Sequence, residues 1–172
     1  MRRGVRHPDT APATLLLAIS AATLAAVYAS QYIGGLQPCQ LCLYQRWPWW
    51  GALALSALAL LPALSIRLRV LLLMAAGLGL LAGGGVAIYH VGVEQHWWPG
   101  PASCGATGQI PGSFAEMQQM MQRPAASCDE PAWTLLGVSM AGYNAMLSIA
   151  VSAWVLVAGA AALTGTGRER LQ

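Results

Sequence analysis

The chain has 172 residues, of which 56% are hydrophobic and only 9% are charged. An ordinary soluble domain is about 25% charged, so the composition argues against a soluble enzyme, and its many apolar residues argue against disorder. The net charge of +3 comes from nine arginines and six acids, without lysine. These arginines are scattered between apolar runs, whereas a nucleic-acid-binding protein clusters them on one face. The composition therefore predicts a membrane protein.

Four stretches of the sequence have the roughly 20 mostly apolar residues that a membrane-spanning helix needs. They cover residues 13–33, 47–66, 70–89 and 135–163. Each run is apolar on all sides, as lipid-embedded helices are. We therefore predict an all-α membrane protein with one domain over residues 1–172. It is a bundle of four transmembrane helices with two outward loops, at about 31–45 and 91–130.

Two interruptions of these runs are compatible with a helix bundle. Pro62 is predicted to mark the end of the second helix, and Gly83-Gly84-Gly85 a close packing face on the third. An alternative for the N-terminus is a cleavable signal peptide, because a charged start and an apolar core precede small residues near Ala29. Cleavage would leave three helices.

The arginines predict the orientation of the bundle. Seven of the nine precede the first helix, connect the second and third, or follow the fourth: Arg2, Arg3, Arg6, Arg67, Arg69, Arg168 and Arg170. Only Arg46 and Arg123 fall on the other side. Cytoplasmic loops carry the excess of arginine, so we expect both termini in the cytoplasm and the two long loops outside.

All four cysteines lie in the predicted outward loops, Cys39 and Cys42 in the first and Cys104 and Cys128 in the second. An even number on the oxidising side of a membrane indicates disulfides, and spacing suggests the pairs 39–42 and 104–128. A zinc site is a weaker alternative because the second pair is 24 positions apart. A structural staple is a serious alternative for Cys104–Cys128. A Cys-x-x-Cys disulfide, however, removes little chain entropy and is easily reduced, which favours redox work.

The position of the Cys-x-x-Cys segment suggests how a thiolate could be stabilised. Pro38 precedes Cys39, and proline is favoured in the first turn of a helix, so the segment is expected to open the second helix. Backbone N–H groups at a helix N-terminus lower a thiol pKa. Arg46 is four residues beyond Cys42 and could stabilise a Cys42 thiolate or bind an electronegative ligand atom. The alternative is an interfacial arginine that reaches towards lipid headgroups.

Several other residues, most of them expected near the outward membrane interface, also call for interpretation. Trp47, Trp49 and Trp50 are typical of the aromatic belt at the membrane interface, although one of them could line a flat aromatic ligand. His90 ends the third predicted helix, where it could donate a hydrogen bond, move a proton or simply be solvated. Asn144 lies inside the fourth apolar run and is expected to hold helices together by hydrogen bonding.

The second outward loop is rich in proline and glycine, which predicts an irregular segment around Cys104. Within it, residues 113–122 are expected to form a short helix. Phe114, Met117 and Met121 make an apolar stripe on that helix, which either lies on the bilayer surface or packs against the loop.

These features together resemble the DsbB family of disulfide-bond-forming membrane proteins. The resemblance covers residues 13–163 and is carried by the segment Gln37-Pro38-Cys39-Gln40-Leu41-Cys42-Leu43-Tyr44-Gln45-Arg46, by Tyr89-His90, and by Cys104 and Cys128. It implies a thiol:quinone oxidoreductase of the bacterial inner membrane, with a DsbA-like, thioredoxin-fold periplasmic oxidase as its partner.

The resemblance also implies a role for each site residue. The reduced partner would attack the Cys104–Cys128 disulfide, with Cys104 in the mixed disulfide and Cys128 as the resolving cysteine. Cys39–Cys42 would reoxidise that pair and pass the electrons to ubiquinone or menaquinone. Cys42 would face the quinone.

Two residues outside the cysteines are implied to bind the quinone. Arg46 would lie near a quinone oxygen, and His90 would lie close by.

Two other functions remain to be separated from this one. A vitamin K epoxide reductase-like protein also couples loop cysteines and a Cys-x-x-Cys to a quinone, but there the motif lies late in the chain. A non-catalytic scaffold with stapled loops is the second alternative. Replacing Cys39 and Cys42 should leave a scaffold functional and disable a relay.

Overall fold

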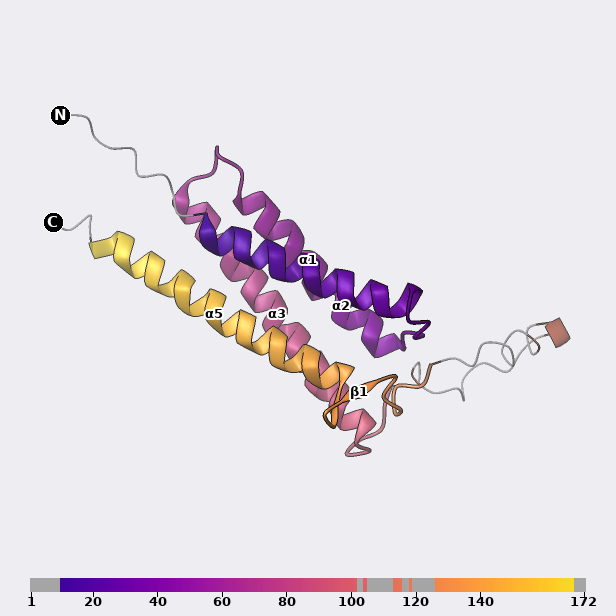
Figure 1. Ribbon diagram of the computed structural model, residues 1–172. Coiled ribbons are helices and arrows are strands. Elements are labelled where there is room, and N and C mark those ends of the chain that lie inside the picture. Colours follow the sequence, from indigo (N-terminus) through magenta and orange to yellow (C-terminus); the bar gives the residue numbers. More distant parts are fainter. Residues whose placement is uncertain (1–9, 102–103, 105–112, 116–117, 119–125, 169–172) are drawn as a thin grey trace, which may run out of the picture.

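The computed structural model describes residues 10–101, 104, 113–115, 118 and 126–168. In this part of the chain four long helices form a bundle: α1 (Ala11–Tyr32), α2 (Gln40–Ala59), α3 (Ile66–Glu94) and α5 (Met140–Arg168) (Figure 1). A small antiparallel hairpin, β1 (Thr134–Leu135) and β2 (Val138–Ser139), precedes α5. The hairpin is the one departure, within these residues, from the predicted all-α fold.

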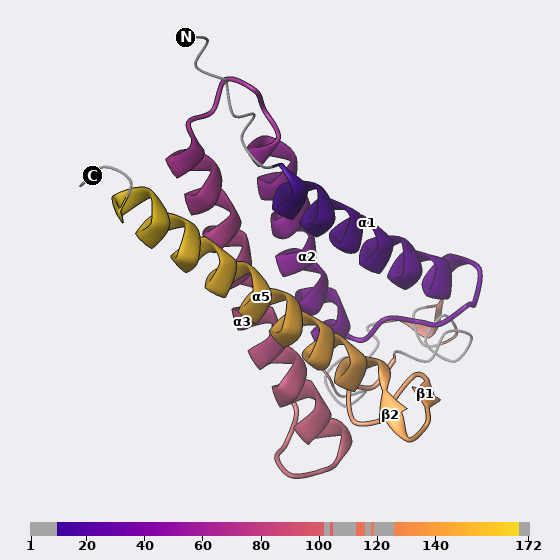
Figure 2. The same ribbon diagram turned by 60° about the vertical axis from the view of Figure 1, so that its left-hand side comes forward.

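The helix α3 lies at the centre of the bundle, where it packs against both α2 and α5, and α1 packs against α2. The start of α1, the α2–α3 connection and the end of α5 lie at one end of the molecule (Figures 1 and 2). The start of α2 and the hairpin lie at the other end, which is the cysteine end. The helices thus run between these two ends (Figures 1 and 2).

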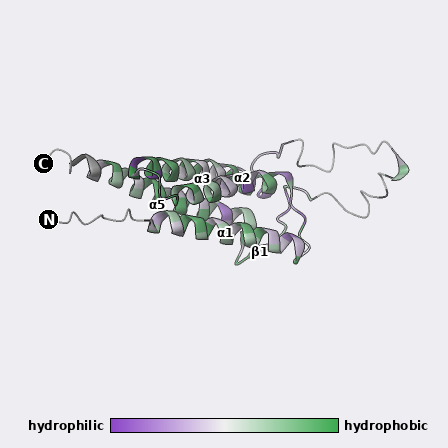
Figure 3. Ribbon diagram, turned by 90° about the horizontal axis from the view of Figure 1, so that it is seen from above, coloured by the Kyte–Doolittle hydropathy of each residue, from purple (hydrophilic) through white to green (hydrophobic). Residues whose placement is uncertain are grey.

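Three helices of the described part are long and apolar enough to cross a membrane: α1, α3 and residues Met140–Gly165 of α5. Figure 3 shows that apolar residues extend along most of the bundle. The chain is therefore a helical membrane protein. α2 is not among these candidate spans; its 20 residues include Arg46 and two glutamines.

The second helix begins and ends earlier than the predicted run of residues 47–66. Cys39 is its N-cap, with extended backbone, and its sulfur accepts a hydrogen bond from the Cys42 N–H at 3.3 Å. This cap and the preceding Pro38 start the helix at Gln40. The helix stops at Ala59, before Pro62, in agreement with the prediction that this proline marks a helix end.

The other two boundaries also differ from the prediction. α3 starts at Ile66 and continues to Glu94, so His90 lies one turn inside the helix instead of at its end. The last helix starts at Met140, not at residue 135, because the preceding residues form the hairpin. Leu136 and Gly137 have φ values of 51° and 77°, the left-handed conformations that a two-residue hairpin turn requires.

Close packing between α2 and α3 depends on the glycine cluster of α3. A Cβ atom on Gly83 would lie 2.6 Å from Cγ of Pro48, and one on Gly84 would lie 3.1 Å from Cγ1 of Ile149. A Cβ on Gly85 would meet nothing within 4 Å. The predicted packing face is therefore confirmed for Gly83 and Gly84, which contact α2 and α5 respectively.

The first helix contributes to the same apolar core as the others. Ala13, Leu16 and Leu24 of α1 are buried together with Leu80 of α3 and Val155 of α5. α1 thus packs as a helix of the bundle. Most of the predicted helix at 113–122, and most of the loop around Cys104, lie outside the described residues.

Candidate active site

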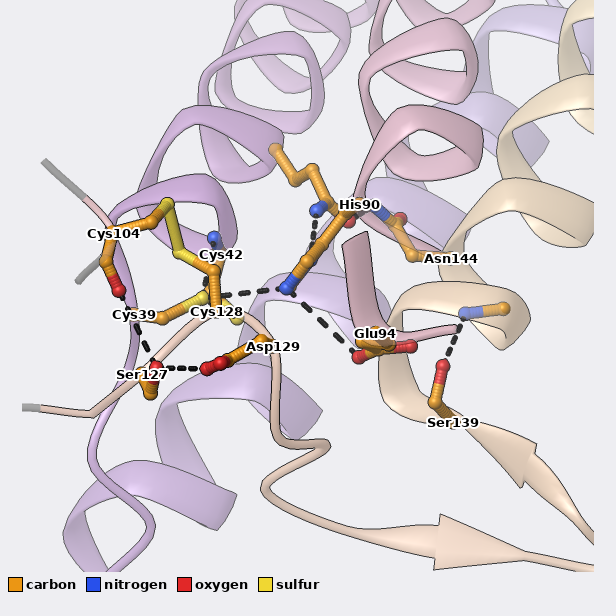
Figure 4. Close-up of polar contacts among 12 residues, drawn as sticks. Cys39, Cys42, His90, Glu94, Cys104, Ser127, Cys128, Asp129, Ser139 and Asn144 are labelled. Atoms are coloured by element: carbon orange, nitrogen blue, oxygen red, sulfur yellow. Dashed lines mark hydrogen bonds and ion pairs between the residues drawn. A yellow bond between two sulfur atoms is a disulfide. The ribbon is translucent and has the colours of Figure 1, made fainter. Parts of the chain in front are cut away.

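All four cysteines meet at the cysteine end of the bundle. Cys39 caps α2, Cys42 lies in the first turn of that helix, and the loop between α3 and β1 supplies Cys104 and Cys128 (Figure 4). They form one packed cluster with Leu41 and Val93. Residues more than 60 positions apart in sequence are thereby brought into one site.

The structure contains one disulfide and one dithiol among these residues. Cys104 and Cys128 are joined by a disulfide, with their Cα atoms 5.2 Å apart, which confirms the pairing suggested by their spacing. Cys39 and Cys42 are free thiols whose sulfur atoms lie 2.9 Å apart. The Cys39–Cys42 pair is therefore in its reduced form, with its two sulfur atoms in contact.

The two pairs are also close to each other. The sulfurs of Cys39 and Cys128 and a ring nitrogen of His90 all lie within 4.8 Å of one another. Zinc needs free thiolates, and Cys128 is bonded to Cys104, so this grouping does not supply the ligands of a zinc site. A thiol beside a disulfide is instead the arrangement that thiol–disulfide exchange requires.

Hydrogen-bond donors surround the sulfur of Cys39, which precedes α2. The Cys42 N–H donates to it, the Cys42 sulfur lies 2.9 Å away, and Nε2 of His90 lies 3.5 Å away. The hydrogen bond from Cys42 lowers the pKa of the Cys39 thiol to about 4, aided by His90 and opposed by burial. The sequence prediction of a stabilised thiolate at Cys42 is therefore wrong in its position. The helix N-cap position, with its free N–H groups, belongs to Cys39.

His90 lies on the Cys39 side of the site and is 2% exposed. Its Nδ1 is 2.8 Å from Nε2 of Gln45, and its Nε2 is 3.9 Å from a carboxylate oxygen of Glu94, one turn further along α3. The ring is thus held by both α2 and α3.

A cavity opens beside the Cys39 sulfur, and we call it the cysteine cavity. Its lining comes from α2, α3, the end of the cysteine loop and the start of α5: Gln37, Cys39, Cys42, His90, Glu94, Ala126, Ser127, Glu130, Pro131, Ala132, Met140 and Ala141. Three carboxylate or imidazole groups face it, so this cavity is polar on one side.

A second hollow lies between α1 and α5, and we call it the lateral groove. Its wide part, about 540 Å³, is lined mainly by apolar residues: Ala22, Thr23, Ala26, Val27, Ser30, Leu36, Trp133, Met140, Tyr143, Asn144 and Leu147. Its inner end shares part of this lining and reaches Cys42, Arg46 and Trp49. The volume is within the range of small-molecule sites, about 300–1,000 Å³.

Arg46 is fixed at the inner end of the lateral groove. Its Nη1 donates to Oε1 of Gln31 at 2.7 Å, and its guanidinium lies 5.0 Å from the centroid of the Tyr28 ring. Its Nε is buried and has no hydrogen-bond partner. The structure thus brings Arg46 and Cys42 to the same hollow, whereas His90 does not line it.

The three tryptophans of α2 have different surroundings. Trp47 and Trp50 are 71% and 44% exposed, which suits an aromatic belt, but Trp49 is 2% exposed and lines the inner end of the lateral groove. The indole N–H of Trp49 donates to Asn144 at 2.8 Å. Asn144 also donates to Gln45 at 2.7 Å, which confirms that it joins helices by hydrogen bonding.

Sequence reasoning did not single out Gln45 or rank Glu94. Both are buried beside His90, at 5% and 7% exposure. The available signal for Gln45 was its place on the buried stripe of α2, four residues after Leu41 and four before Trp49. A polar residue on an otherwise apolar stripe points to a buried hydrogen-bond partner.

The two cysteines of the loop disulfide differ in exposure. Cys128 has no exposed surface, whereas Cys104 is 6% exposed. The Cys128 N–H donates to the Cys104 carbonyl at 3.3 Å, so a backbone hydrogen bond joins the same two residues as the disulfide. Nearby, the Ser127 hydroxyl donates to Asp129 and lowers the pKa of that exposed carboxyl.

Comparisons with known proteins relate the chain to one protein family. A family model described as "Disulfide bond formation protein DsbB" matches residues 9–158. A disulfide bond formation protein B of Marinobacter nauticus is 31% identical over 137 residues, which cover 77% of this chain and 80% of that protein. The corresponding protein of an Acidovorax species is 32% identical over 149 residues, with coverage of 79% and 80%. An uncharacterized protein of Rickettsia prowazekii is 31% identical over 138 residues, 78% of each chain. No solved structure gives a significant match.

Proposed function

The chain belongs to the DsbB family of disulfide-forming membrane oxidoreductases, and on that premise we propose that it is a thiol:quinone oxidoreductase. It reoxidises a DsbA-like, thioredoxin-fold dithiol oxidase in the periplasm and passes the electrons to a membrane quinone. Disulfide bond formation in secreted proteins is driven by this relay.

One observation carries the proposal. The Cys39 sulfur lies within 4.8 Å of the Cys128 sulfur, although the two residues come from different loops. A purely structural loop disulfide has no need of a free thiol, stabilised as a thiolate, beside it. Exchange between the two pairs needs one, because the thiolate is the form that attacks or leaves.

The first exchange takes place at Cys104. A thiolate of the reduced partner attacks Cys104, the 104–128 bond breaks, and its electron pair stays on the sulfur of Cys128. The second thiol of the partner then attacks the partner's own sulfur in the mixed disulfide and releases Cys104 as a thiolate. The greater exposure of Cys104 supports this choice, since Cys128 offers no surface to an incoming thiol.

The second exchange transfers the electrons to the Cys39–Cys42 pair at the start of α2. The Cys128 thiolate attacks Cys39 in a 39–42 disulfide, and the thiolate of Cys42 leaves. Cys104 then attacks Cys128, which restores the loop disulfide and leaves Cys39 as a thiolate. The sum is one disulfide broken and one formed, and the products are the dithiol and the disulfide found in the structure.

The lateral groove fits a quinone. Its wide part is apolar and lies between α1 and α5, and its inner end holds Cys42 and the guanidinium of Arg46 with an unpartnered buried Nε. Arg46 would donate to a quinone oxygen, and Cys42 would be the thiol nearest to the ring. A quinone supplies the oxidising power that cysteines lack, by accepting two electrons and two protons.

We further propose that the protein crosses the bacterial inner membrane four times, with α2 as the additional span. Its 20 residues give a length of about 30 Å, the thickness of the hydrocarbon layer. The start of α1 and the end of α5 would then both face the cytoplasm. The position of Arg67 at the end of the bundle opposite the cysteines supports this orientation.

A trapping experiment tests the exchange between the pairs. The double variant Cys42→Ser, Cys104→Ser leaves only Cys39 and Cys128, which we expect to form a disulfide under mild oxidation, detected by mass spectrometry. The matched control Cys39→Ser, Cys104→Ser leaves Cys42, which is not part of the close group, and should cross-link more slowly. Equal rates, or no 39–128 disulfide, would contradict the proposed route.

A further inference from the structure

A line of hydrogen bonds runs from Trp49 of α2 to Asn144 of α5, back to Gln45 of α2, and on through His90 of α3 to the Cys39 sulfur. The Trp49 indole donates to Oδ1 of Asn144 at 2.8 Å, and Nδ2 of Asn144 donates to Oε1 of Gln45 at 2.7 Å. Nε2 of Gln45 then lies 2.8 Å from Nδ1 of His90. Nε2 of His90, at the far side of the ring, lies 3.5 Å from the sulfur of Cys39 (Figure 4).

The first member of this line fixes the direction of all the others. An indole N–H can only donate, so the oxygen of Asn144 must face Trp49 and its NH₂ group must face Gln45. Gln45 then presents its own oxygen to Asn144 and its NH₂ group to His90. Nδ1 of His90 can only accept from that group, so it carries no proton.

We propose that Trp49, Asn144 and Gln45 are positioning residues that hold His90 as the neutral tautomer protonated on Nε2, so that the ring donates a hydrogen bond to Cys39. The hydrogen bond at one ring nitrogen selects which nitrogen carries the proton. The tautomer follows from geometry alone, and its use in catalysis rests on the proposed relay.

The other charged or titratable groups around the ring are consistent with this tautomer. Glu94 lies 3.9 Å from the same Nε2, so its carboxylate also favours a proton on that nitrogen. The backbone N–H of Cys42 also donates to the Cys39 sulfur, at 3.3 Å. Cys39 therefore receives donors from both α2 and α3.

The tautomer matters whenever Cys39 becomes a thiolate. In the exchange that restores the loop disulfide, Cys104 attacks Cys128, the 39–128 bond breaks, and its electron pair leaves on the Cys39 sulfur. A proton on Nε2 of His90 stabilises that sulfur. A proton on Nδ1 would turn a lone pair towards it instead.

The test is the protonation state of His90, read by ¹⁵N NMR of histidine-labelled protein in detergent micelles. The chain has three histidines, so His7→Gln and His96→Asn leave His90 as the single signal. Asparagine suits position 96, because its φ of 58° is a conformation that asparagine adopts. We expect protonated Nε2 and unprotonated Nδ1. A proton on Nδ1 would overturn the inference.

The substitution Asn144→Asp is expected to invert the line of donors. A carboxylate accepts from Trp49 and also from Gln45, so Gln45 must turn its oxygen towards His90, and the proton moves to Nδ1. An unchanged tautomer in this variant would contradict the proposal. Should Asn144→Asp not fold, the double variant Trp49→Phe, Ser148→Ala removes both donors to Oδ1 of Asn144 and should lower the share of the Nε2-protonated tautomer. An unchanged share would again contradict the proposal.

A second readout measures the effect on Cys39 without any partner or quinone. In a Cys42→Ser background, with the loop disulfide intact, Cys39 is the single free thiol. We expect Asn144→Asp to raise the pH at which its alkylation by iodoacetamide reaches half of its maximal rate by about one unit, the order of one hydrogen bond to a charged group. An unchanged pH profile would overturn the positioning role. Loss of turnover in the unaltered protein, with the expected tautomer and alkylation profile, would count against the relay alone.

Discussion

The two sides of the Cys-x-x-Cys turn are built differently. Cys39 faces the cysteine cavity, with His90, Glu94 and the loop disulfide around it. Cys42 lines that cavity too, but it also reaches the inner end of the lateral groove, where Arg46 lies and Cys39 does not. Cys39 and Cys42, three positions apart, thus differ in their surroundings: Cys39 lines the cysteine cavity alone, and Cys42 also lines the lateral groove.

This difference suggests separate places for the two halves of the proposed relay. Exchange with another disulfide needs a stabilised thiolate and hydrogen-bond donors, which surround Cys39. Transfer to a lipid-soluble acceptor needs an apolar approach and one positioned polar group, which are found beside Cys42. Changes on one side should therefore leave the other side working.

The largest effect is expected from Cys104→Ser. This variant keeps Cys39, Cys42 and the lateral groove, but it removes the sulfur that the partner is proposed to attack. Oxidation of a reduced thioredoxin-like partner should be abolished, as measured by the partner's thiol content over time. A variant that still oxidised the partner at the normal rate would refute the role of the loop.

A smaller effect, on quinone use instead of partner oxidation, is expected from Arg46→Ala. Loss of one charged hydrogen bond should weaken the apparent affinity for quinone about ten- to a hundredfold, while the first exchange with the partner remains largely intact. Steady-state kinetics at varied quinone concentration give the affinity, and single-turnover trapping of the mixed disulfide gives the exchange. Unchanged quinone dependence would remove Arg46 from the quinone site.

The pH dependence of alkylation should distinguish the two cysteines of the turn. The Cys39 thiol has its pKa lowered to about 4, so it stays a thiolate, and its alkylation rate should be nearly constant from about pH 5.5 to 8.5. An ordinary thiol loses about tenfold in rate per pH unit below about 8.5. Site-resolved mass spectrometry of alkylated protein would show this, and an ordinary profile for Cys39 would contradict the assigned thiolate.

The smallest effects concern the packing of α2 on α3. Gly83→Ala places a methyl group 2.6 Å from Pro48, and overpacking of this kind costs about 1–3 kcal/mol. The matched control is Gly85→Ala, which meets nothing and should be neutral or slightly stabilising. Thermal unfolding in detergent compares them, and equal midpoints would show that the α2–α3 contact is not critical.

The sequence predicted the features that depend on local chemistry. Cysteine spacing indicated the 104–128 disulfide, and Pro38 indicated that the Cys-x-x-Cys segment opens a helix. Hydropathy located α1 within two residues at its start and one at its end. Composition alone was enough to indicate a helical membrane protein.

The features that depend on contacts between distant segments could not be predicted. The approach of Cys39 to Cys128 and the buried partners of His90 arise from packing of α2 on α3, which leaves no mark in either segment alone. The thiolate was expected at Cys42 because Arg46 is near in sequence, but the N-cap position favours Cys39. The hairpin before α5 was not predicted either. Its turn places Leu136 in a left-handed conformation, which is unusual for leucine, and its residues continue the apolar run of the last helix.

The most direct test of the relay is quinone reduction by the purified protein, supplied with a reduced thioredoxin-like dithiol. We expect turnover that is lost when any one of Cys39, Cys42, Cys104 and Cys128 is replaced by serine. Absence of turnover with both ubiquinone and menaquinone, in protein that is folded and has its disulfides formed, would contradict the relay and favour a scaffold with a stapled loop.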